Sequence, residues 1–302
     1  MNVSGLTVNA LARELRREGV QIRIGTYLVR IQSSLSSIAQ GLHLLYADYP
    51  LEPEAAFADF HVSIDPPKNV RRWLAPQVIF RTDGFVPFKP LPADQAYPLL
   101  EWGLNWCIST QYHRYLVIHG AVIEKNGRAM ILPAPPGSGK STLCAALVTR
   151  GWRLLSDELT LVSLDTLEIV PMCRPVSLKN ESIQIIQGFE KTVTMGRASH
   201  DTNKGTVAHM RAPTASVMRS QETAVPAWVV FPKYEPSVTA QLDEHAKASA
   251  CMKIADNTFN YSMLGLRGFQ TASNLIDRCD CYTFNYSNLD DAVTRFHDLA
   301  QQ

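Results

Sequence analysis

The spacing of apolar residues predicts an N-terminal unit that mixes helices and strands. Apolar side chains recur at helical spacing over residues 6–18, and Gly19 follows where a helix would end. The later segments of this unit are, in chain order, a strand at 20–24, a helix at 35–45, a strand at 60–64 and a hairpin at 78–88 that turns at Asp83–Gly84. Its core is expected to include the aromatic residues Trp73, Phe80, Phe85 and Phe88.

A proline-containing segment separates this unit from the rest of the chain. Residues 88–92 read Phe-Lys-Pro-Leu-Pro. Proline has a fixed φ and no backbone N–H, so alternating prolines favour a linker over a helix or a central strand. With a length of 302 residues, the sequence predicts an α+β domain at 1–92 and a second domain at 93–302.

The second part of the chain alternates helices and strands around another hairpin. A helix is expected over 97–110, and the apolar runs 116–118 and 129–132 flank Asn126–Gly127, a dipeptide typical of tight hairpin turns. Further elements follow in this order: a helix to about Arg150, strands near 153–155, 159–164 and 228–231, and a last helix from Asn288. This pattern favours an α/β fold for the second part and α+β overall.

The second strand of this hairpin leads directly into a phosphate-loop motif. Residues 134–141 read Ala-Pro-Pro-Gly-Ser-Gly-Lys-Ser, and Ala134 stands where the pattern usually has glycine. Backbone N–H groups at a helix N-terminus attract phosphate, the motif's lysine bridges β- and γ-phosphates, and its hydroxyl binds magnesium. The predicted ligand is ATP with Mg²⁺, and the predicted nucleotide-binding residues are Ala134, Pro135, Pro136, Gly137, Ser138, Gly139, Lys140, Ser141 and Thr142.

Two acidic residues follow the next predicted strand. Asp157 and Glu158 stand at its carboxyl end, where parallel α/β sheets place ligand sites. Phosphoryl transfer uses one carboxylate near the metal and one that takes the proton of the attacking hydroxyl. A solvated turn is the alternative, and the nearby loop favours the functional interpretation. His119 lies among apolar residues, so a core histidine is the alternative to a catalytic one.

Together these motifs resemble the catalytic domain of bacterial HPr kinase/phosphorylase. The residues that carry this likeness are His119–Gly120, the loop, Arg150–Gly151 and Leu154-Leu155-Ser156-Asp157-Glu158. Residues 132–142, 175–182 and 204–209 look more closely like the HPr kinase-related kinase A group. The resemblance covers roughly residues 110–300. It implies a P-loop core of the fold shared with phosphoenolpyruvate carboxykinase, and transfer of the ATP γ-phosphoryl group to a hydroxyl.

The resemblance also implies roles for single residues. Lys140 and Ser141 match the residues that hold phosphate and magnesium. Asp157 matches the first of two aspartates near the metal, and Glu158 replaces the second, which is the family's proton acceptor. His119 matches an active-site histidine. These four, Lys140, Asp157, Glu158 and His119, are the expected catalytic residues.

The chain also departs from the family pattern. Besides Ala134, Thr142 stands where the bifunctional enzymes carry glutamate. The family's segment with a second metal-binding glutamate is not found, and Glu181 is the nearest substitute, so the candidate magnesium ligands are Ser141, Asp157 and Glu181. These departures count against reverse phosphorolysis and recognition of HPr, and the kinase activity is the part of the resemblance that is better supported.

Three basic residues lie in a region that contains glycine, threonine and proline and is suited to close over phosphate or acceptor: Lys179, Lys204 and Arg211. Lys204 is favoured because a cation beside the flexible Gly205 can stabilise the transferring phosphoryl charge. An ordinary basic surface loop is the alternative for each.

Composition narrows the partners. Lysine and arginine number 29 against 28 aspartates and glutamates, a net charge of +1, which disfavours a dedicated nucleic-acid binder. No apolar run approaches the roughly 20 residues of a membrane span, so no membrane partner is expected. The N-terminus lacks the apolar region of a secretory signal, and the six cysteines lack metal-ligand spacing, which suits the cytoplasm.

Two functions are compatible with these observations. The first is a Mg-ATP-dependent kinase that acts on a Ser/Thr-type hydroxyl of a small protein, a peptide or a small molecule. The second is a nucleotide-gated binding module in which residues 1–92 recruit a partner and ATP switches conformation without phosphoryl transfer. Only the kinase requires Glu158. The resemblance further suggests a homo-oligomer.

Overall fold

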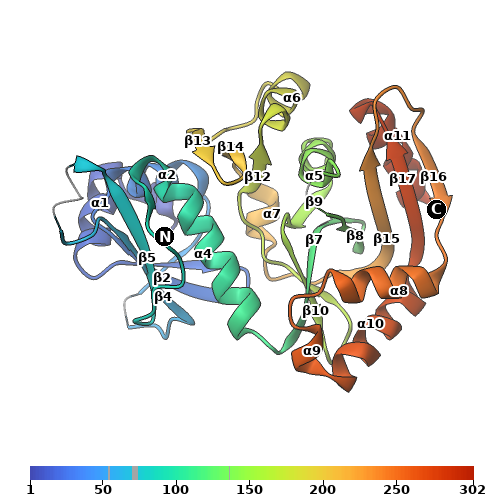
Figure 1. The fold of residues 1–302 in the computed structure, drawn as a ribbon, viewed down its shortest axis with the longest axis horizontal. Helices are drawn as coiled ribbons and strands as arrows, with labels where there is room; N and C mark the ends of the chain where they lie inside the picture. Colours follow the sequence, from blue (N-terminus) through green and yellow to red (C-terminus); the bar gives the residue numbers. More distant parts are fainter. Residues whose placement is uncertain (54, 70–73, 136) are drawn as a thin grey trace.

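The computed structural model describes residues 1–53, 55–69, 74–135 and 137–302. Over these residues the fold is mixed α/β, with a six-stranded, an eight-stranded and a three-stranded sheet (Figure 1). This agrees with the predicted mixture of helices and strands.

The six-stranded sheet belongs to the N-terminal part and has the strand order β3-β1-β2-β4-β5-β6. Its strands are β1 (Val20–Ile24), β2 (Tyr27–Ser33), β3 (Leu51–Glu52), β4 (Phe60–Asp65), β5 (Gln77–Thr82) and β6 (Leu91–Pro92), and the helices packed with it include α1 (Val8–Arg16) and α2 (Ser36–Leu45). The Thr7 hydroxyl accepts from the Ala10 N–H at 3.2 Å and caps α1. The predictions at 6–18, 20–24, 35–45 and 60–64 are confirmed.

The hairpin predicted at 78–88 forms only in part. Thr82 and Phe85 bridge around a turn in which Asp83 and Gly84 have positive φ, but no second strand follows. Prolines in residues 86–90 lack the N–H that a ladder needs. β5 instead pairs with β6, so the predicted linker supplies an edge strand.

The aromatic core predicted for this unit also needs correction. Phe80 is fully buried and Phe88 packs partly buried against the core, whereas Phe85 is 71% exposed because it sits at the tip of the turn. Trp73 lies outside the described residues.

Helix α4 (Ala96–Gln111) joins the two parts of the molecule. It packs on α2, β4 and β5, and a Cβ at Gly103 would meet the Phe80 ring at 2.1 Å, so helix and sheet are in close contact. One buried apolar cluster runs from α1 and α2 through α4 into the C-terminal helices. The domain division at residue 92 stays a prediction.

The C-terminal part is built on the other two sheets. The eight-stranded sheet contains β7 (Tyr115–Lys125), β8 (Arg128–Pro133), β9 (Arg153–Ser156), β10 (Leu159–Ser163), β11 (Ile169–Val170), β15 (Val225–Tyr234), β16 (Gln241–Glu244) and β17 (Asp280–Tyr286). The three-stranded sheet contains β12 (Val176–Lys179), β13 (Ser199–Thr202) and β14 (Gly205–Met210). The helices are α5 (Lys140–Thr149), α6 (Glu181–Phe189), α7 (Thr214–Met218), α8 (Lys247–Asp256), α9 (Tyr261–Leu264), α10 (Leu266–Arg278) and α11 (Leu289–Gln301).

The strand register brings the predicted motifs together at the middle of β7. On one side of β7, Gly120 pairs with Pro133 at the end of β8, where the phosphate loop begins. On the other side, His119 pairs with Leu159 at the start of β10, directly after Asp157 and Glu158. The acidic turn was expected at the end of a parallel strand, but β9 pairs antiparallel with β7. Since β8 is also antiparallel to β7, β8 and β9 run in the same direction and end at the same edge.

Within the described part of the chain, no helix is both long and apolar enough to cross a membrane. The six cysteines are all free thiols, and Cys251 is the one that is partly exposed.

Candidate functional site

The phosphate loop connects β8 to α5 and is held by the ends of two parallel strands. Gly137 and Gly139 have φ of 88° and 86°, a conformation that side-chain-bearing residues rarely adopt. The Tyr286 hydroxyl, at the end of β17, donates to the Gly139 carbonyl at 3.1 Å. The Tyr234 N–H, at the end of β15, donates to the Ser138 carbonyl at 3.0 Å. The loop is therefore fixed against the carboxyl edge of the sheet.

An open cavity of about 830 Å³ lies over this loop. Ala134 is buried at the end of the strand, and Pro136 lies outside the described residues. The other predicted nucleotide-binding residues all line the cavity: Pro135, Gly137, Ser138, Gly139, Lys140, Ser141 and Thr142.

Asp157 lies behind the loop and contacts the two loop residues that are predicted to bind phosphate and magnesium. The ammonium group of Lys140, a residue only 8% exposed, donates to the Asp157 carbonyl at 3.3 Å. The Ser141 hydroxyl donates to Asp157 Oδ2 at 3.3 Å, and the Ser177 N–H donates to the same oxygen at 3.0 Å. Burial raises the pKa of Asp157.

The second carboxylate oxygen of Asp157, Oδ1, is buried and has no hydrogen-bond partner among the described residues. A buried polar atom without a partner is costly, and hard cations such as Mg²⁺ are bound by carboxylate and hydroxyl oxygens. The pair formed by Asp157 and Ser141 therefore fits a magnesium ion. No group of three or more His, Cys, Asp or Glu residues suited to a metal occurs in the part of the chain that the structure describes.

Glu158 lines the cavity beside three lysines. Asn105 Nδ2 donates to Glu158 Oε2 at 2.7 Å, and Lys179 Nζ lies 3.8 Å from Oε1. Burial acts to raise the pKa of Glu158, but the positive charges of Lys140, Lys204 and Lys179 outweigh it and lower the pKa to about 2. The carboxylate is therefore ionised at neutral pH.

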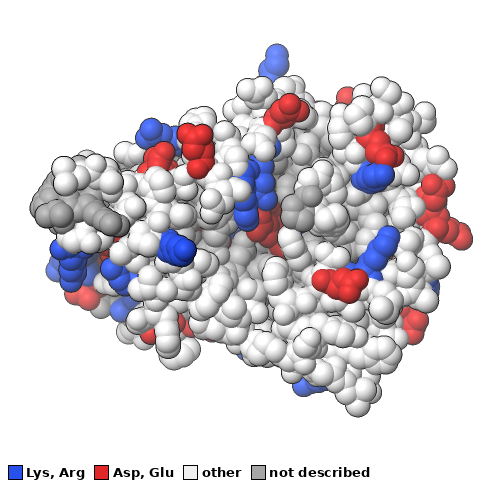
Figure 2. All heavy atoms as spheres, viewed as in Figure 1, with Lys and Arg blue, Asp and Glu red and all other residues white. Residues whose placement is uncertain are grey.

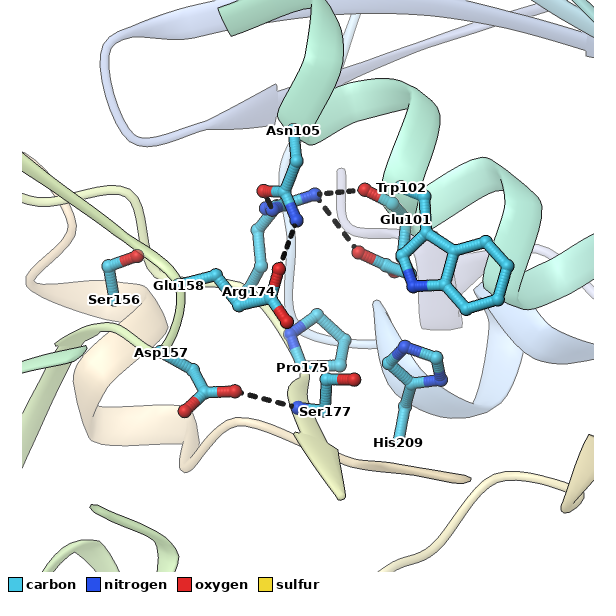
Figure 3. A pocket seen from close by; sticks show the side chains of 10 residues that line it. All are labelled: Glu101, Trp102, Asn105, Ser156, Asp157, Glu158, Arg174, Pro175, Ser177 and His209. Carbon is cyan, nitrogen blue, oxygen red and sulfur yellow. Dashed lines mark hydrogen bonds and ion pairs between the residues drawn. The ribbon is translucent and has the colours of Figure 1, made fainter. Parts of the chain in front are cut away.

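Behind this carboxylate, a buried ion pair links α4 to the chain before β12 (Figure 3). The Arg174 guanidinium donates to the Asn105 side-chain oxygen and pairs with Glu101 at 3.1 Å. Glu101 also accepts hydrogen bonds from the Tyr46 and Tyr97 hydroxyls, both at 2.9 Å. This network fixes the Asn105 amide, which in turn holds the catalytic candidate.

His119 lies at the side of the same cavity. Its ring stacks on Phe259 with ring centroids 5.6 Å apart. Burial, aided by the positive charge of Lys140, lowers the pKa of His119 to about 4, so the imidazole is neutral near pH 7.

The predicted phosphate-contacting cations divide into two groups. Lys179 and Lys204 line the cavity, and Lys204 Nζ lies over the Trp102 ring, 5.1 Å from its centroid. Arg211 does not line it, and instead pairs with Asp48 of the N-terminal part at 2.6 Å. Figure 2 shows basic and acidic side chains together in the hollow near the middle of the displayed face.

Glu181 is not brought next to Asp157. It is exposed at the start of α6 and lines a second cavity, of about 770 Å³, which shares the loop with the first and also contains Tyr234 and Tyr286. Its role as a magnesium ligand stays a prediction.

Sequence analysis missed the contribution of α4. Its residues Trp102, Asn105, Trp106 and Ser109 all line the cavity. Their spacing of i, i+3, i+4 and i+7 is the one available signal, because it places polar and tryptophan side chains on one helix face. No local pattern marks Arg174, which reaches the site through tertiary structure.

Comparisons with known proteins give limited matches. The family model described as "SynChlorMet cassette protein ScmC" matches residues 103–168, a segment that contains His119, the loop, Asp157 and Glu158 but is well under half of the chain. No curated protein matches the chain. Among solved structures, the chain is similar to the HPr(Ser) kinase/phosphatase from Coxiella burnetii, with 10% identity over 61% of this chain and 97% of that chain and a TM-score of 0.28. That TM-score is too low to establish a shared fold.

Proposed function

We propose that this protein is a magnesium-dependent kinase that transfers the γ-phosphoryl group of ATP to a Ser/Thr-type hydroxyl, on a peptide or small protein in the cytoplasm. The observation that carries the proposal is the convergence of Lys140, Ser141, Asp157 and Glu158 on one side of the phosphate loop. Under this proposal the C-terminal part is a P-loop core of the HPr kinase and phosphoenolpyruvate carboxykinase type, as the sequence motifs suggest.

In this proposal, different groups of the loop and its neighbours bind the phosphates and the magnesium ion. Lys140 and the N–H groups at the start of α5 would hold the phosphates. The Ser141 hydroxyl and the Asp157 carboxylate would hold magnesium, and the unpartnered Oδ1 of Asp157 supports this assignment. When bound, magnesium neutralises negative charge on the phosphate oxygens.

Glu158 is the proposed proton acceptor. In the transfer, the acceptor oxygen forms a bond to the γ-phosphorus, the bond from that phosphorus to the β–γ bridging oxygen breaks, and ADP leaves. The hydroxyl proton passes to Glu158. A pKa of about 2 makes a weak base, but phosphate charge beside Lys140, Lys179 and Lys204 would offset the positive field that lowers this pKa.

The test compares Glu158→Gln with the wild-type protein, using labelled ATP and a lysate of the native cells. We expect Glu158→Gln to bind ATP as wild type does and to lose transfer by about 10²–10⁴-fold, the usual contribution of acid–base catalysis. Lys140→Ala should lose ATP binding, and Glu244→Gln, at an exposed acid on β16 that does not line the cavity, serves as the matched carboxylate control. Binding of ATP with no labelled product from either protein would support the nucleotide-gated module instead.

A further inference from the structure

The face of α4 that lines the cavity is unusually aromatic. Trp102 and Trp106 are half-buried on this face, whereas the opposite face is packed into the core through residues such as Leu100, Leu104 and Ile108. Trp106 also packs in part against this core, and both indoles still line the cavity. Aromatic surface left open in a cavity that also holds polar groups is typical of a ligand site.

Aromatic residues from two other segments continue this surface. The Phe88 ring, from the segment before β6, packs edge-on against Trp106 with centroids 6.1 Å apart. Phe259, between α8 and α9, is 53% exposed and stacks on the neutral His119 ring. All of these side chains line the same cavity as the loop, and we call four of them the aromatic subsite: Phe88, Trp102, Trp106 and Phe259.

The aromatic subsite itself contains no charged residue. Glu158 is the one acidic residue among the described residues that line the cavity, and the positive charges of Lys140, Lys204 and Lys179 stabilise its ionised form. Of these cations, Lys204 alone contacts a subsite ring. The four subsite residues contain no carboxylate to pair with a basic side chain, and their rings favour an uncharged apolar one.

Helix α4 also determines how far the aromatic subsite lies from Glu158. Asn105, which donates to Glu158, lies between Trp102 and Trp106 within one helical turn. An extended peptide advances about 3.3 Å per residue. A side chain one or two positions from a hydroxyl at Glu158 therefore reaches these rings.

We propose that the aromatic subsite binds an aromatic or large aliphatic side chain that flanks the acceptor hydroxyl, so that the acceptor is a peptide segment with an apolar residue within two positions of its serine or threonine. This inference rests on the proposed kinase function, because it uses Glu158 to locate the hydroxyl.

The first experiment uses seven-residue peptides with a central serine in an alanine background. The positions beside the serine carry Phe, Leu, Ala, Lys or Asp, and both phosphorylation from labelled ATP and peptide binding by calorimetry are measured. Burial of one such side chain corresponds to about a 10–100-fold gain. We expect kcat/KM and affinity to be higher by this factor for Phe and Leu than for Ala, Lys and Asp.

Two variants with equal exposure of the removed ring supply the matched comparison. Phe259→Ala removes a subsite ring, whereas Phe269→Ala removes a ring that is 52% exposed on α10 and does not line the cavity. Phe259→Ala should reduce the preference for Phe over Ala peptides to less than 3-fold, with ATP affinity unchanged. Phe269→Ala should keep the full preference.

The outcomes separate this inference from the kinase proposal. Equal phosphorylation and binding of all peptides by wild type would overturn the subsite and leave the kinase standing. Preferential binding of Phe and Leu peptides that depends on Phe259, without transfer, would support the subsite and count against the kinase. ATP hydrolysis with neither binding nor labelling of any peptide would overturn the peptide acceptor.

Discussion

At the scale of single residues, the two loop glycines have the same backbone conformation in different surroundings. Both have φ near 86–88°, so any Cβ costs about 1–2 kcal/mol. At Gly139 a Cβ would also lie 2.5 Å from Tyr286 Oη, whereas at Gly137 nothing lies within 4 Å. At position 139 a side chain is therefore disfavoured by both the positive φ and the contact with Tyr286, whereas at position 137 it is disfavoured by the positive φ alone.

We predict that Gly139→Ala lowers the free energy of unfolding by about 2–4 kcal/mol, and Gly137→Ala by about 1–2 kcal/mol, in urea denaturation. Combining Gly139→Ala with Tyr286→Phe removes the clashing hydroxyl, so the double variant should be more stable than the additive sum of the two single changes. Strict additivity would show that the 2.5 Å approach to Tyr286 is not the cause.

His119 gives a pH dependence with a defined sign. Its pKa is lowered from 6.5 to about 4 in the folded protein, so between these values the unfolded chain binds more protons and stability falls as pH falls. With allowance for the partial exposure of the ring, this loss amounts to about 1–2 kcal/mol between pH 7 and pH 4. Denaturation of His119→Gln over the same range should show a shallower decline. An identical slope in both proteins would mean that His119 titrates normally.

Single residues also show how much of the candidate site can be predicted from the sequence. Lys140 and Ser141 belong to a short motif that forms a local turn, and Glu158 follows the next strand, so nearby residues were enough to predict that the three lie together at one cavity. Arg211 was predicted to contact phosphate but pairs with Asp48, far away in the sequence. A local pattern identifies a cation and cannot say which distant carboxylate will bind it.

At the scale of elements, α4 serves both the core and the site. One face packs on α2 and β5, and the other presents Asn105, whose amide links Glu158 to Arg174. Helical periodicity predicted this element well, as it did α1, α2 and α5. The strands β12, β13 and β14 were missed: β12 and β13 have only four residues each, and all three form a small sheet of their own, separate from the main sheet of the C-terminal part. The partial failure of the 78–88 hairpin had a chemical cause, the missing N–H group of Pro87 and of Pro90 directly after it.

We predict that Asn105 is a positioning residue for Glu158. Asn105→Ala should lower kcat for phosphoryl transfer by about 10-fold or more and leave the KM for ATP nearly unchanged, because an unpositioned carboxylate affects transfer more than binding. Asn105→Asp adds a negative charge beside Glu158, so the acid limb of the pH–rate profile should move to higher pH. Ser109→Ala, on the same face with its hydroxyl bonded to the Trp106 carbonyl at 3.2 Å, is the control. An unshifted profile in Asn105→Asp would rule out this role.

At the scale of the whole molecule, the net charge of +1 is close to neutral, but charged side chains are concentrated at the candidate site. Three lysines surround Glu158 at the loop, and the buried pair of Arg174 and Glu101 stands behind it. Breaking a buried pair leaves an uncompensated charge and is far more costly than losing a surface pair. The N-terminal part supplies one partner of this network, the Tyr46 hydroxyl, so the candidate site and the N-terminal part are coupled through hydrogen bonds as well as apolar packing.

This coupling predicts the behaviour of a truncated chain. A fragment of residues 93–302 exposes the apolar face of α4 to water and leaves Glu101 without Tyr46. The fragment also lacks Asp48, which pairs with Arg211, and Tyr49, whose hydroxyl donates to the Cys173 carbonyl at 3.1 Å. We therefore expect the fragment to lack a cooperative thermal transition and to bind ATP at least 10-fold more weakly than the full chain, while adding residues 1–92 in trans restores part of both. A fragment that melts cooperatively and binds ATP as the full chain does would show instead that 93–302 folds on its own, and that the boundary predicted from the prolines separates two independent domains.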